Sequence, residues 1–157
     1  MMVSEEEALE AYIDTPERVD FYKNGFEKYT VTGISQFQWH WSWWAFFGGV
    51  FYLLYRKLYL EALGYFLLFA VASFSPLISI VLWIVSGGVL PYFVYQRYLK
   101  TKAQVTQNLS SAQEQTEALR VVGGVNKWAI WVAVGLHLLM WVSALSFILM
   151  ANARQMP

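Results

Sequence analysis

The sequence has no cysteine among its 157 residues, and only 14% of those residues are charged. Without thiols the chain can form no disulfide, no zinc–thiolate site and no cysteine-ligated iron–sulfur cluster. Its formal net charge is zero, so the charge balance does not favour nucleic acid, and no nucleic-acid partner is expected. Soluble domains carry about a quarter of charged residues, so the shortage argues against that class.

Hydrophobic and aromatic side chains are abundant instead, at 57% and 18% of all residues. Aromatic rings are enriched at bilayer surfaces, where one end of the ring is dry and the other is wet. Acidic residues gather near the start, with eight Asp or Glu against three Lys or Arg in the first 30 positions. A secretory signal needs a basic start followed at once by an apolar run, so this stretch is not one. The composition predicts an integral membrane protein with an acidic cytoplasmic head over residues 1–38.

Two short helices are predicted within this head. Residues 4–7, S-E-E-E, match a capping box and predict a helix over about 5–13. Thr15 followed by Pro16 is a second start signal, which predicts a helix out to about Tyr29. The alternative is an acidic, partly disordered tail.

Three later stretches read as membrane spans, namely 58–75, 77–95 and 127–151. The first contains Glu61, whereas 77–95 and 128–150 contain no charged residue. Crossing a hydrocarbon core of about 30 Å takes about 20 helical residues, so the last two are long enough and the first is short. The strict alternation of a membrane β-barrel is absent. The predicted fold is an all-α integral membrane protein with short cytoplasmic N-terminal helices, an aromatic interfacial or re-entrant helix and three transmembrane helices.

Lysine and arginine set the orientation. One side of the membrane would hold the head, the Arg56-Lys57 pair, a polar helical linker over 96–126 and Lys127, with ten of the eleven basic residues. Only Arg154 falls on the other side, in a short tail over 152–157. Because basic loops stay in the cytoplasm, the N-terminus is predicted inside and the C-terminus on the outer side.

Residues 39–57 carry four tryptophans in six positions, then an apolar run, then a basic pair. About fourteen apolar residues are too few to cross easily, which predicts a helix that lies in the cytoplasmic interface or enters and returns. A fourth span is the alternative. The tryptophans would sit at headgroup depth and the basic pair would reach the phosphates, although the rings could instead stack on a ligand or grip a lipid. The predicted lipid-binding residues are Trp39, Trp41, Trp43, Trp44, Arg56 and Lys57.

Two glycine pairs and one proline are predicted to pack against a neighbouring helix or a partner. Glycine lets helices approach closely, and proline frees a backbone carbonyl. A hinge in the second span is the alternative. The residues concerned are Gly48, Gly49, Gly87, Gly88 and Pro91.

Glu61 and His137 are the weaker candidates for a ligand site. Glu61 could mark a proton or ion path, but a salt bridge to Lys57, four residues away, is the simpler interpretation. His137 could hold haem or a pigment, or face a partner helix, and His40 is too distant along the chain to join it. No metal-ligand spacing, phosphate-binding loop or Ser-His-Asp arrangement appears. No enzyme, metal site or other cofactor is therefore predicted.

Residues 41–59, W-S-W-W-A-F-F-G-G-V-F-Y-L-L-Y-R-K-L-Y, resemble the hallmark of a family of small bacterial inner-membrane proteins that is catalogued only as a domain of unknown function. That hallmark is a tryptophan followed by A-F-F-F-G-P and later L-Y-R-K-M-Y, so Gly49 and Leu58 depart from it. The stretches 21–29 and 87–98 are also similar to the family, so the resemblance covers about residues 20–100. It implies a place in the bacterial cytoplasmic (inner) membrane and no established activity, and the last span lies outside it.

These observations predict a non-catalytic accessory, scaffold or assembly subunit of a larger bacterial membrane complex, in contact with membrane lipids. The first alternative is a small homo-oligomeric transporter or channel-like protein that uses Glu61 and the Gly87–Pro91 break. The second is a haem- or pigment-binding subunit that uses His137.

Overall fold

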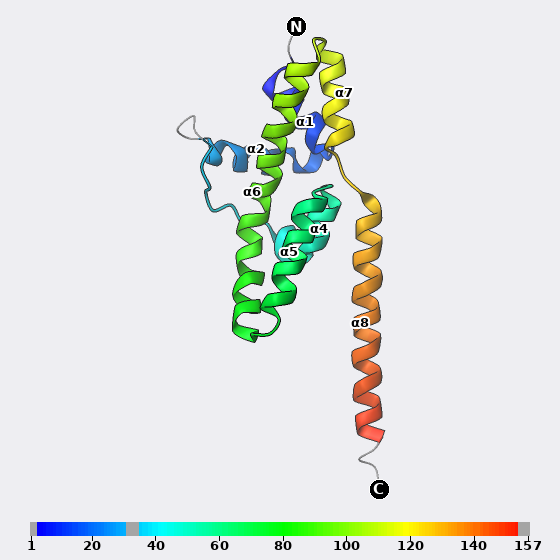
Figure 1. Cartoon of the computed structure of the whole chain (residues 1–157). Helices are drawn as coiled ribbons and strands as arrows, with labels where there is room; N and C mark the ends of the chain where they lie inside the picture. The colour runs from blue at the N-terminus through cyan, green and yellow to red at the C-terminus, as the bar shows by residue number, and fades with distance from the viewer. Residues whose placement is uncertain (1–2, 31–34, 154–157) are drawn as a thin grey trace.

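A computed structural model describes residues 3–30 and 35–153, so most of the predicted tail over 152–157 lies outside the described residues. Within the described residues the protein is all-helical, as predicted, with eight α-helices and no strand. In chain order they are α1 (Glu5–Ile13), α2 (Pro16–Tyr29), α3 (Trp43–Gly48), α4 (Val50–Tyr55), α5 (Tyr59–Ala72), α6 (Pro76–Asn108), α7 (Ala112–Val122) and α8 (Lys127–Ala153) (Figure 1).

The first two helices begin where the local signals predict. The Ser4 hydroxyl accepts from the backbone N–H of Glu7, whose carboxylate accepts from the backbone N–H of Ser4, completing the capping box of α1. α2 has Pro16 in its first turn, where the missing N–H removes no helical bond. Both helices bury one face, and their residues match the two helices predicted from the sequence.

α6, with 33 residues, is the longest of the described helices, and its two halves have different neighbours (Figure 1). Its upper half packs against α1, α2 and α7, and its lower half forms an antiparallel hairpin with α5. The first part of the predicted linker continues α6 to Asn108, and α7 forms much of the rest. The linker is therefore helical, and it belongs to the head.

Aromatic rings build much of the head core. Tyr12 and Phe26 pack against Tyr98 with ring centroids 5.2 and 5.5 Å away, and the hydroxyls of Tyr22 and Tyr52 share a 2.9 Å hydrogen bond. Burial of such rings supplies a large apolar area while the hydroxyls seek partners. Tyr52 lies on α4, the helix that leads into α5. This core therefore also attaches α4 to the head.

Two helices, α6 and α8, are long and apolar enough to cross a membrane; the second apolar window falls within 112–147, where α7 is charged and α8 is free of charge after its first residue, Lys127. α5 corresponds to the first predicted span but has only 14 residues. Such a helix rises about 21 Å, less than the hydrocarbon core of about 30 Å. The structure therefore has two candidate spanning helices and one shorter apolar helix in place of the three predicted spans.

The aromatic segment is not the single helix predicted over 39–57. Residues 35–42 form neither helix nor strand, and the six-residue helices α3 and α4 follow, separated at Gly49. Gly49 has φ 48°, in the left-handed region that favours glycine, and a Cβ there would lie 3.5 Å from the Tyr65 ring of α5. A Cβ on Gly48 would lie 3.1 Å from the Cβ of Tyr52. Both glycines thus pack within the α3–α5 unit.

Candidate membrane interface

Residues 39–42 form an extended strap across α6. A Cβ on Gly88 would lie 2.5 Å from the Trp39 ring, and a Cβ on Gly87 would lie 2.7 Å from the Trp41 ring. A larger residue at position 87 would push the Trp41 ring away from α6, and a larger residue at position 88 would push the Trp39 ring away. The two glycines therefore receive this chain's own tryptophans.

Pro91 supplies the strap with a hydrogen-bond acceptor. Because proline lacks an N–H, the carbonyl four residues earlier, that of Gly87, has no helical partner. The backbone N–H of Ser42 donates to this oxygen at 2.8 Å. Ser42 also caps α3, since its hydroxyl accepts from the N–H of Ala45 at 3.2 Å. α6 stays helical through Pro91, so the helix break predicted at Gly87–Pro91 is absent, and this stretch is instead a docking point for α3.

Beside the strap, large rings are left exposed, and we call Trp39, Trp43, Trp44 and Phe47 the aromatic patch. Trp43, Trp44 and Phe47 are each about two-thirds exposed, and Trp39 is half-exposed. The Arg18 guanidinium lies 5.0 Å from the centre of the Trp44 ring, a cation–π distance. Such rings with a cation close by suit a boundary between water and lipid.

Arg56, predicted to reach lipid phosphates, is buried inside the protein at 6% exposure. Its Nη1 donates to the carbonyl of Ile13 at 2.8 Å and its Nη2 to the Thr15 hydroxyl at 3.2 Å. The guanidinium also lies 4.6 Å from the centre of the Tyr22 ring. The Ile13 carbonyl ends α1, where a cation is favourable. Arg56 therefore clamps the end of α1 to the α4–α5 junction.

Lys57 clamps a second helix end, because its Nζ donates to the carbonyl of Val121 at 3.0 Å in the last turn of α7. Its φ of 59° places it in the turn between α4 and α5, outside any helix. The helical spacing behind the predicted Lys57–Glu61 salt bridge is therefore absent. The ion pairs of the described residues join Lys23 to Glu6, Lys102 to Glu5 and Arg120 to Asp14, so that prediction is wrong. Glu61 lies partly buried in the first turn of α5.

The start of α8 joins the same junction. The backbone N–H of Asn126 donates to the carbonyl of Tyr55 at 2.8 Å, and its side-chain amide donates to the Tyr59 hydroxyl. The N–H of Gly124 donates to the carbonyl of Tyr12 at 2.7 Å. α5 and α8 therefore begin at one level, directly beneath the head.

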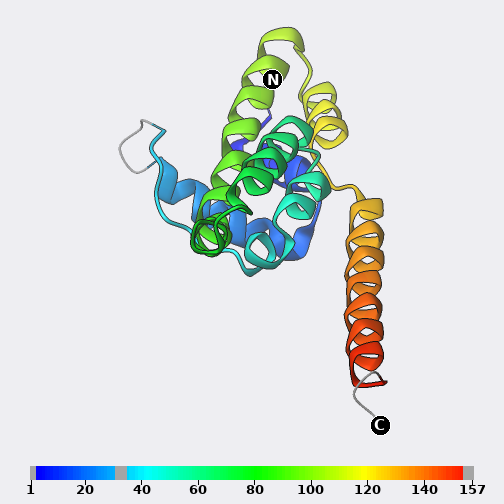
Figure 2. The same cartoon turned by 60° about the horizontal axis from the view of Figure 1, so that its bottom comes forward.

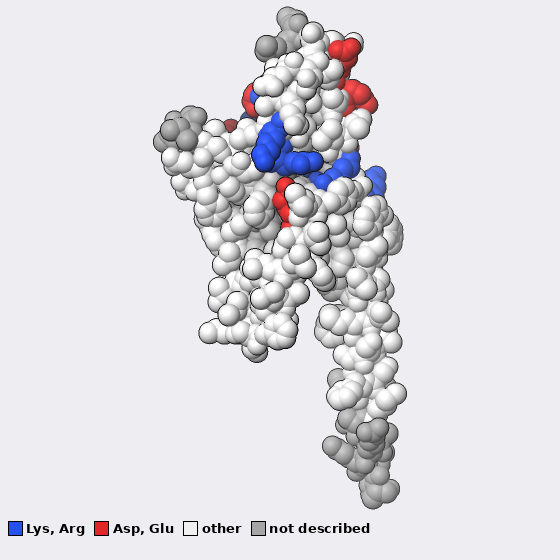
Figure 3. Space-filling view, in the orientation of Figure 1, with Lys and Arg blue, Asp and Glu red and all other residues white. Residues whose placement is uncertain are grey.

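Charge divides the visible face of the molecule into levels (Figure 3). Acidic side chains lie at the top, a band of Lys and Arg crosses the middle with one acidic patch directly below it, and the rest of the lower surface carries no visible charge. The sequence agrees, since no charged residue occurs between Glu61 and Arg97 or between Lys127 and Arg154. A basic band above an apolar surface is the arrangement expected at one face of a membrane.

α8 stands apart from the other helices in both views (Figures 1 and 2). It packs chiefly against α4 near its start, and every side chain from Val134 to Phe147 is exposed. Within that exposed part, the Nδ1 of His137 lies 2.7 Å from the carbonyl oxygen of Ala133. A carbonyl can only accept, so Nδ1 is the donor here, and in the neutral imidazole Nε2 is then the acceptor. His137 thus presents an acceptor on an otherwise apolar helix.

His40 sits on the other side of the strap, against α2. A Cβ on Gly25 would lie 2.8 Å from its ring, and the Phe21 ring centre is 4.4 Å away. Burial, with a smaller contribution from the charge of Lys28, lowers the pKa of His40 below its usual 6.5. His40 Nε2 and the hydroxyls of Tyr29 and Tyr95 are buried with no hydrogen-bond partner in the described structure. Sequence reasoning missed this cluster because only the fold brings α2, α6 and the strap together.

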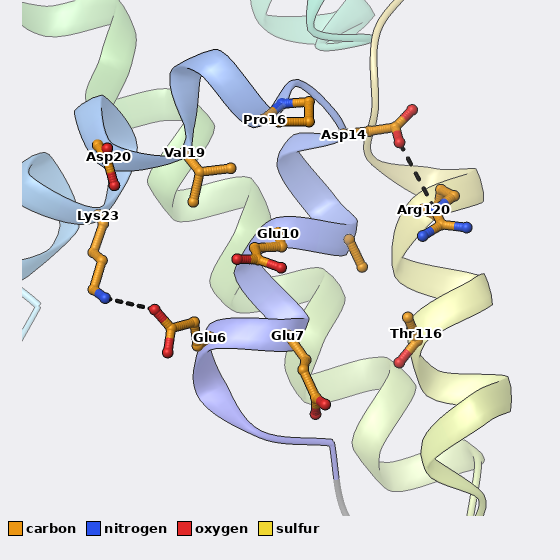
Figure 4. A pocket seen from close by; sticks show the side chains of 11 residues that line it. Glu6, Glu7, Glu10, Asp14, Pro16, Val19, Asp20, Lys23, Thr116 and Arg120 are labelled. Carbon is orange, nitrogen blue, oxygen red and sulfur yellow. Dashed lines mark hydrogen bonds and ion pairs between the residues drawn. The ribbon is translucent and has the colours of Figure 1, made fainter.

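Sequence reasoning also missed an acidic groove of about 430 Å³ on the head, between α1, α2 and α7 (Figure 4). Lys23 pairs with Glu6 at 2.8 Å and Arg120 with Asp14 at 3.8 Å along its walls. Both pairs are exposed, so they add little stability. No cluster of three or more His, Asp or Glu side chains suited to a metal ion occurs among the described residues. The groove is an acidic surface without assigned chemistry.

Comparison with known proteins agrees with the resemblance seen in the sequence. The family described as "Protein of unknown function (DUF2628)" matches residues 5–87, from α1 into α6. The match starts earlier than the resemblance and leaves out nearly all of 87–98, together with α7 and α8. No curated protein and no solved structure matches the chain.

Proposed function

The chain belongs to this family of unknown function, and we propose that it serves as a non-catalytic accessory, scaffold or assembly subunit of a larger bacterial membrane complex. The observation that carries the proposal is the exposed α8 with His137 on its surface. A helix that stays out of its own protein's core is available to another one.

The proposed setting is the bacterial cytoplasmic membrane. α8 has 27 residues and rises about 40 Å, enough to cross the hydrocarbon core, whereas its charge-free length would be costly in water. The basic band would lie at the cytoplasmic face, with the N-terminus inside and the C-terminus outside.

His137 favours a protein partner over lipid alone. It is the eleventh residue of α8, about 15 Å below Lys127, which places it near the bilayer centre. Acyl chains offer no donor to the lone pair on Nε2, whereas polar side chains of a neighbouring helix do. The partner would therefore bring a hydroxyl, amide or N–H group to this depth.

A haem or pigment site at His137 remains the alternative, because its Nε2 could bind the metal of such a group. Metal-binding histidines commonly donate their other N–H to a carbonyl, as Nδ1 does here to Ala133. A visible absorption band lost on mutation of His137 would favour it. The transport alternative draws less support, because α6 is continuous at Gly87–Pro91 and this stretch holds the strap and α3.

The test uses His137→Leu, which removes the acceptor but keeps an apolar helix, and Leu138→Ala as the matched control at an exposed neighbour. Both proteins are extracted in mild detergent and compared by native mass spectrometry. We expect His137→Leu to lose a partner that wild type and Leu138→Ala retain at fixed stoichiometry. Equal retention by His137→Leu would remove His137 from the account.

A further inference from the structure

The α5–α6 hairpin is free of charge over 35 residues, from Ala62 to Gln96, and this includes its tip at residues 73–76, S-F-S-P. At the tip Phe74 is 91% exposed and Leu77 is 73% exposed. A loop that emerges into water on the far side of a membrane usually carries charged side chains, whereas this one has only two serines around an exposed phenylalanine. The tip is therefore suited to a dry environment.

The backbone N–H groups of the tip have hydrogen-bond partners within the hairpin itself. The N–H groups of Ser73, Phe74 and Ser75 donate to carbonyls of α5, and Pro76 has no N–H to satisfy. The Ser73 hydroxyl donates to the carbonyl of Ala70 at 2.6 Å. Because a backbone donor without a partner is very costly in hydrocarbon, this internal bonding permits the turn to stay inside a bilayer.

On α6, the exposed height of the hairpin matches one leaflet. The 14 residues of α5 rise about 21 Å. On α6 the exposed apolar stretch runs from Leu77 to Val85, and above it Ser86 to Gly88 are buried under the strap. The ten residues from Pro76 to Val85 rise about 15 Å, half of a hydrocarbon core of about 30 Å.

The position of the aromatic patch along α6 gives a second, independent estimate of how deep the hairpin lies in the membrane. Ser42, which begins α3, is bonded to Gly87, and Phe46 of α3 stacks on Trp83 at 4.6 Å between ring centres. The patch therefore lies level with residues 83–88 of α6, about 10–18 Å above Pro76. Tryptophan prefers the interface, so a tip at the far surface would leave the patch near the bilayer centre, where tryptophan is disfavoured.

We infer that the α5–α6 hairpin is a re-entrant wedge whose partner is the acyl chains of the cytoplasmic leaflet alone. It enters from the side of the head, reaches about the bilayer centre and returns, while the aromatic patch rests at the interface. α8 begins at the same level as α5, through the contact of Asn126 with Tyr59, but is 13 residues longer (27 against 14). In this arrangement α8 crosses the whole bilayer, whereas the hairpin ends near the bilayer centre.

The inference rests on the membrane setting proposed above, and the absence of cysteine makes both testable in the full chain. Three single-cysteine variants report on three levels: Ser110→Cys in the exposed α6–α7 loop, Phe74→Cys at the tip and Met150→Cys near the end of α8. A membrane-impermeant maleimide is applied to each side of sealed, oriented bacterial membranes, and again after detergent solubilisation. Thiols react as thiolates in water, so a thiol held in hydrocarbon stays unlabelled.

We expect Ser110→Cys to react only from the cytoplasmic side, Met150→Cys only from the outer side, and Phe74→Cys from neither side until detergent is added. Labelling of Phe74→Cys from the outer side would show a full span, and labelling from the cytoplasmic side would show a hairpin outside the bilayer; either overturns the wedge. Failure to label it in detergent would contradict the exposed tip. Cytoplasmic labelling of Met150→Cys would instead overturn the membrane crossing of α8 on which the proposed function depends.

Discussion

Arg56 shows how one side chain joins two parts of the molecule. Its planar group bonds the Ile13 carbonyl and the Thr15 hydroxyl while it covers the Tyr22 ring. Lysine has one nitrogen and no flat face, so it cannot reproduce all three contacts.

We therefore expect Arg56→Lys to lower the thermal midpoint in detergent, with a loss of about 1–3 kcal/mol for hydrogen bonds left unmade. Arg97→Lys is the control, because Arg97 is exposed on α6. Equal thermal midpoints for Arg56→Lys and Arg97→Lys would show that the contacts of the Arg56 guanidinium add no stability beyond that of its positive charge.

His40 sets a dependence of stability on pH. Since burial lowers its pKa in the folded protein, the unfolded chain binds the proton more readily. The stability it contributes is complete above pH 6.5, the usual value, and is lost as pH falls through the lower folded value.

Thermal midpoints measured between about pH 5 and pH 8 should therefore fall on acidification, and His40→Gln should flatten that decline. An unchanged pH profile in His40→Gln would assign the decline to other groups.

Among the elements, the strap and α6 depend on each other. Gly88→Ala brings a Cβ to within 2.5 Å of the Trp39 ring, so the indole must leave its place or α6 must shift. Gly64→Ala on α5 is the matched control, since its Cβ meets nothing within 4 Å.

We expect Gly88→Ala to lower the thermal midpoint and Gly64→Ala to leave it unchanged or raise it, because alanine is the better helix former by up to about 1 kcal/mol. A Gly88→Ala protein as stable as Gly64→Ala would mean that Trp39 is not held on α6.

The same elements show what the sequence can predict. α1 and α2 follow from neighbouring residues, namely the capping box at Ser4 and the proline at position 16, so their limits were predictable. The strap was not, because its extended form depends on Gly87 and Gly88, more than forty residues away. The Lys57–Glu61 pair failed for a related reason, since a helical spacing was assumed across a turn.

At the scale of the whole molecule, the hydrophobic pattern predicted an all-helical protein, and two of the three proposed spans are long enough in the structure. It also indicated that the first span is short, but it could not place the start of α5 at Tyr59, because helix ends depend on contacts such as the Lys57 clamp on α7. Nor could it show that α8 would stand alone, outside the region matched by the family.

The central claim is that α8 joins this protein to a larger complex. Native mass spectrometry of the protein extracted from its own membrane tests it most directly, beside a variant whose residues 128–150 are all leucine. That variant keeps the length and apolarity of α8 but loses its surface pattern. The account predicts a wild-type complex of fixed stoichiometry that the leucine variant does not form. Wild type recovered alone or only with lipid, or a leucine variant that keeps the same partner, would contradict it.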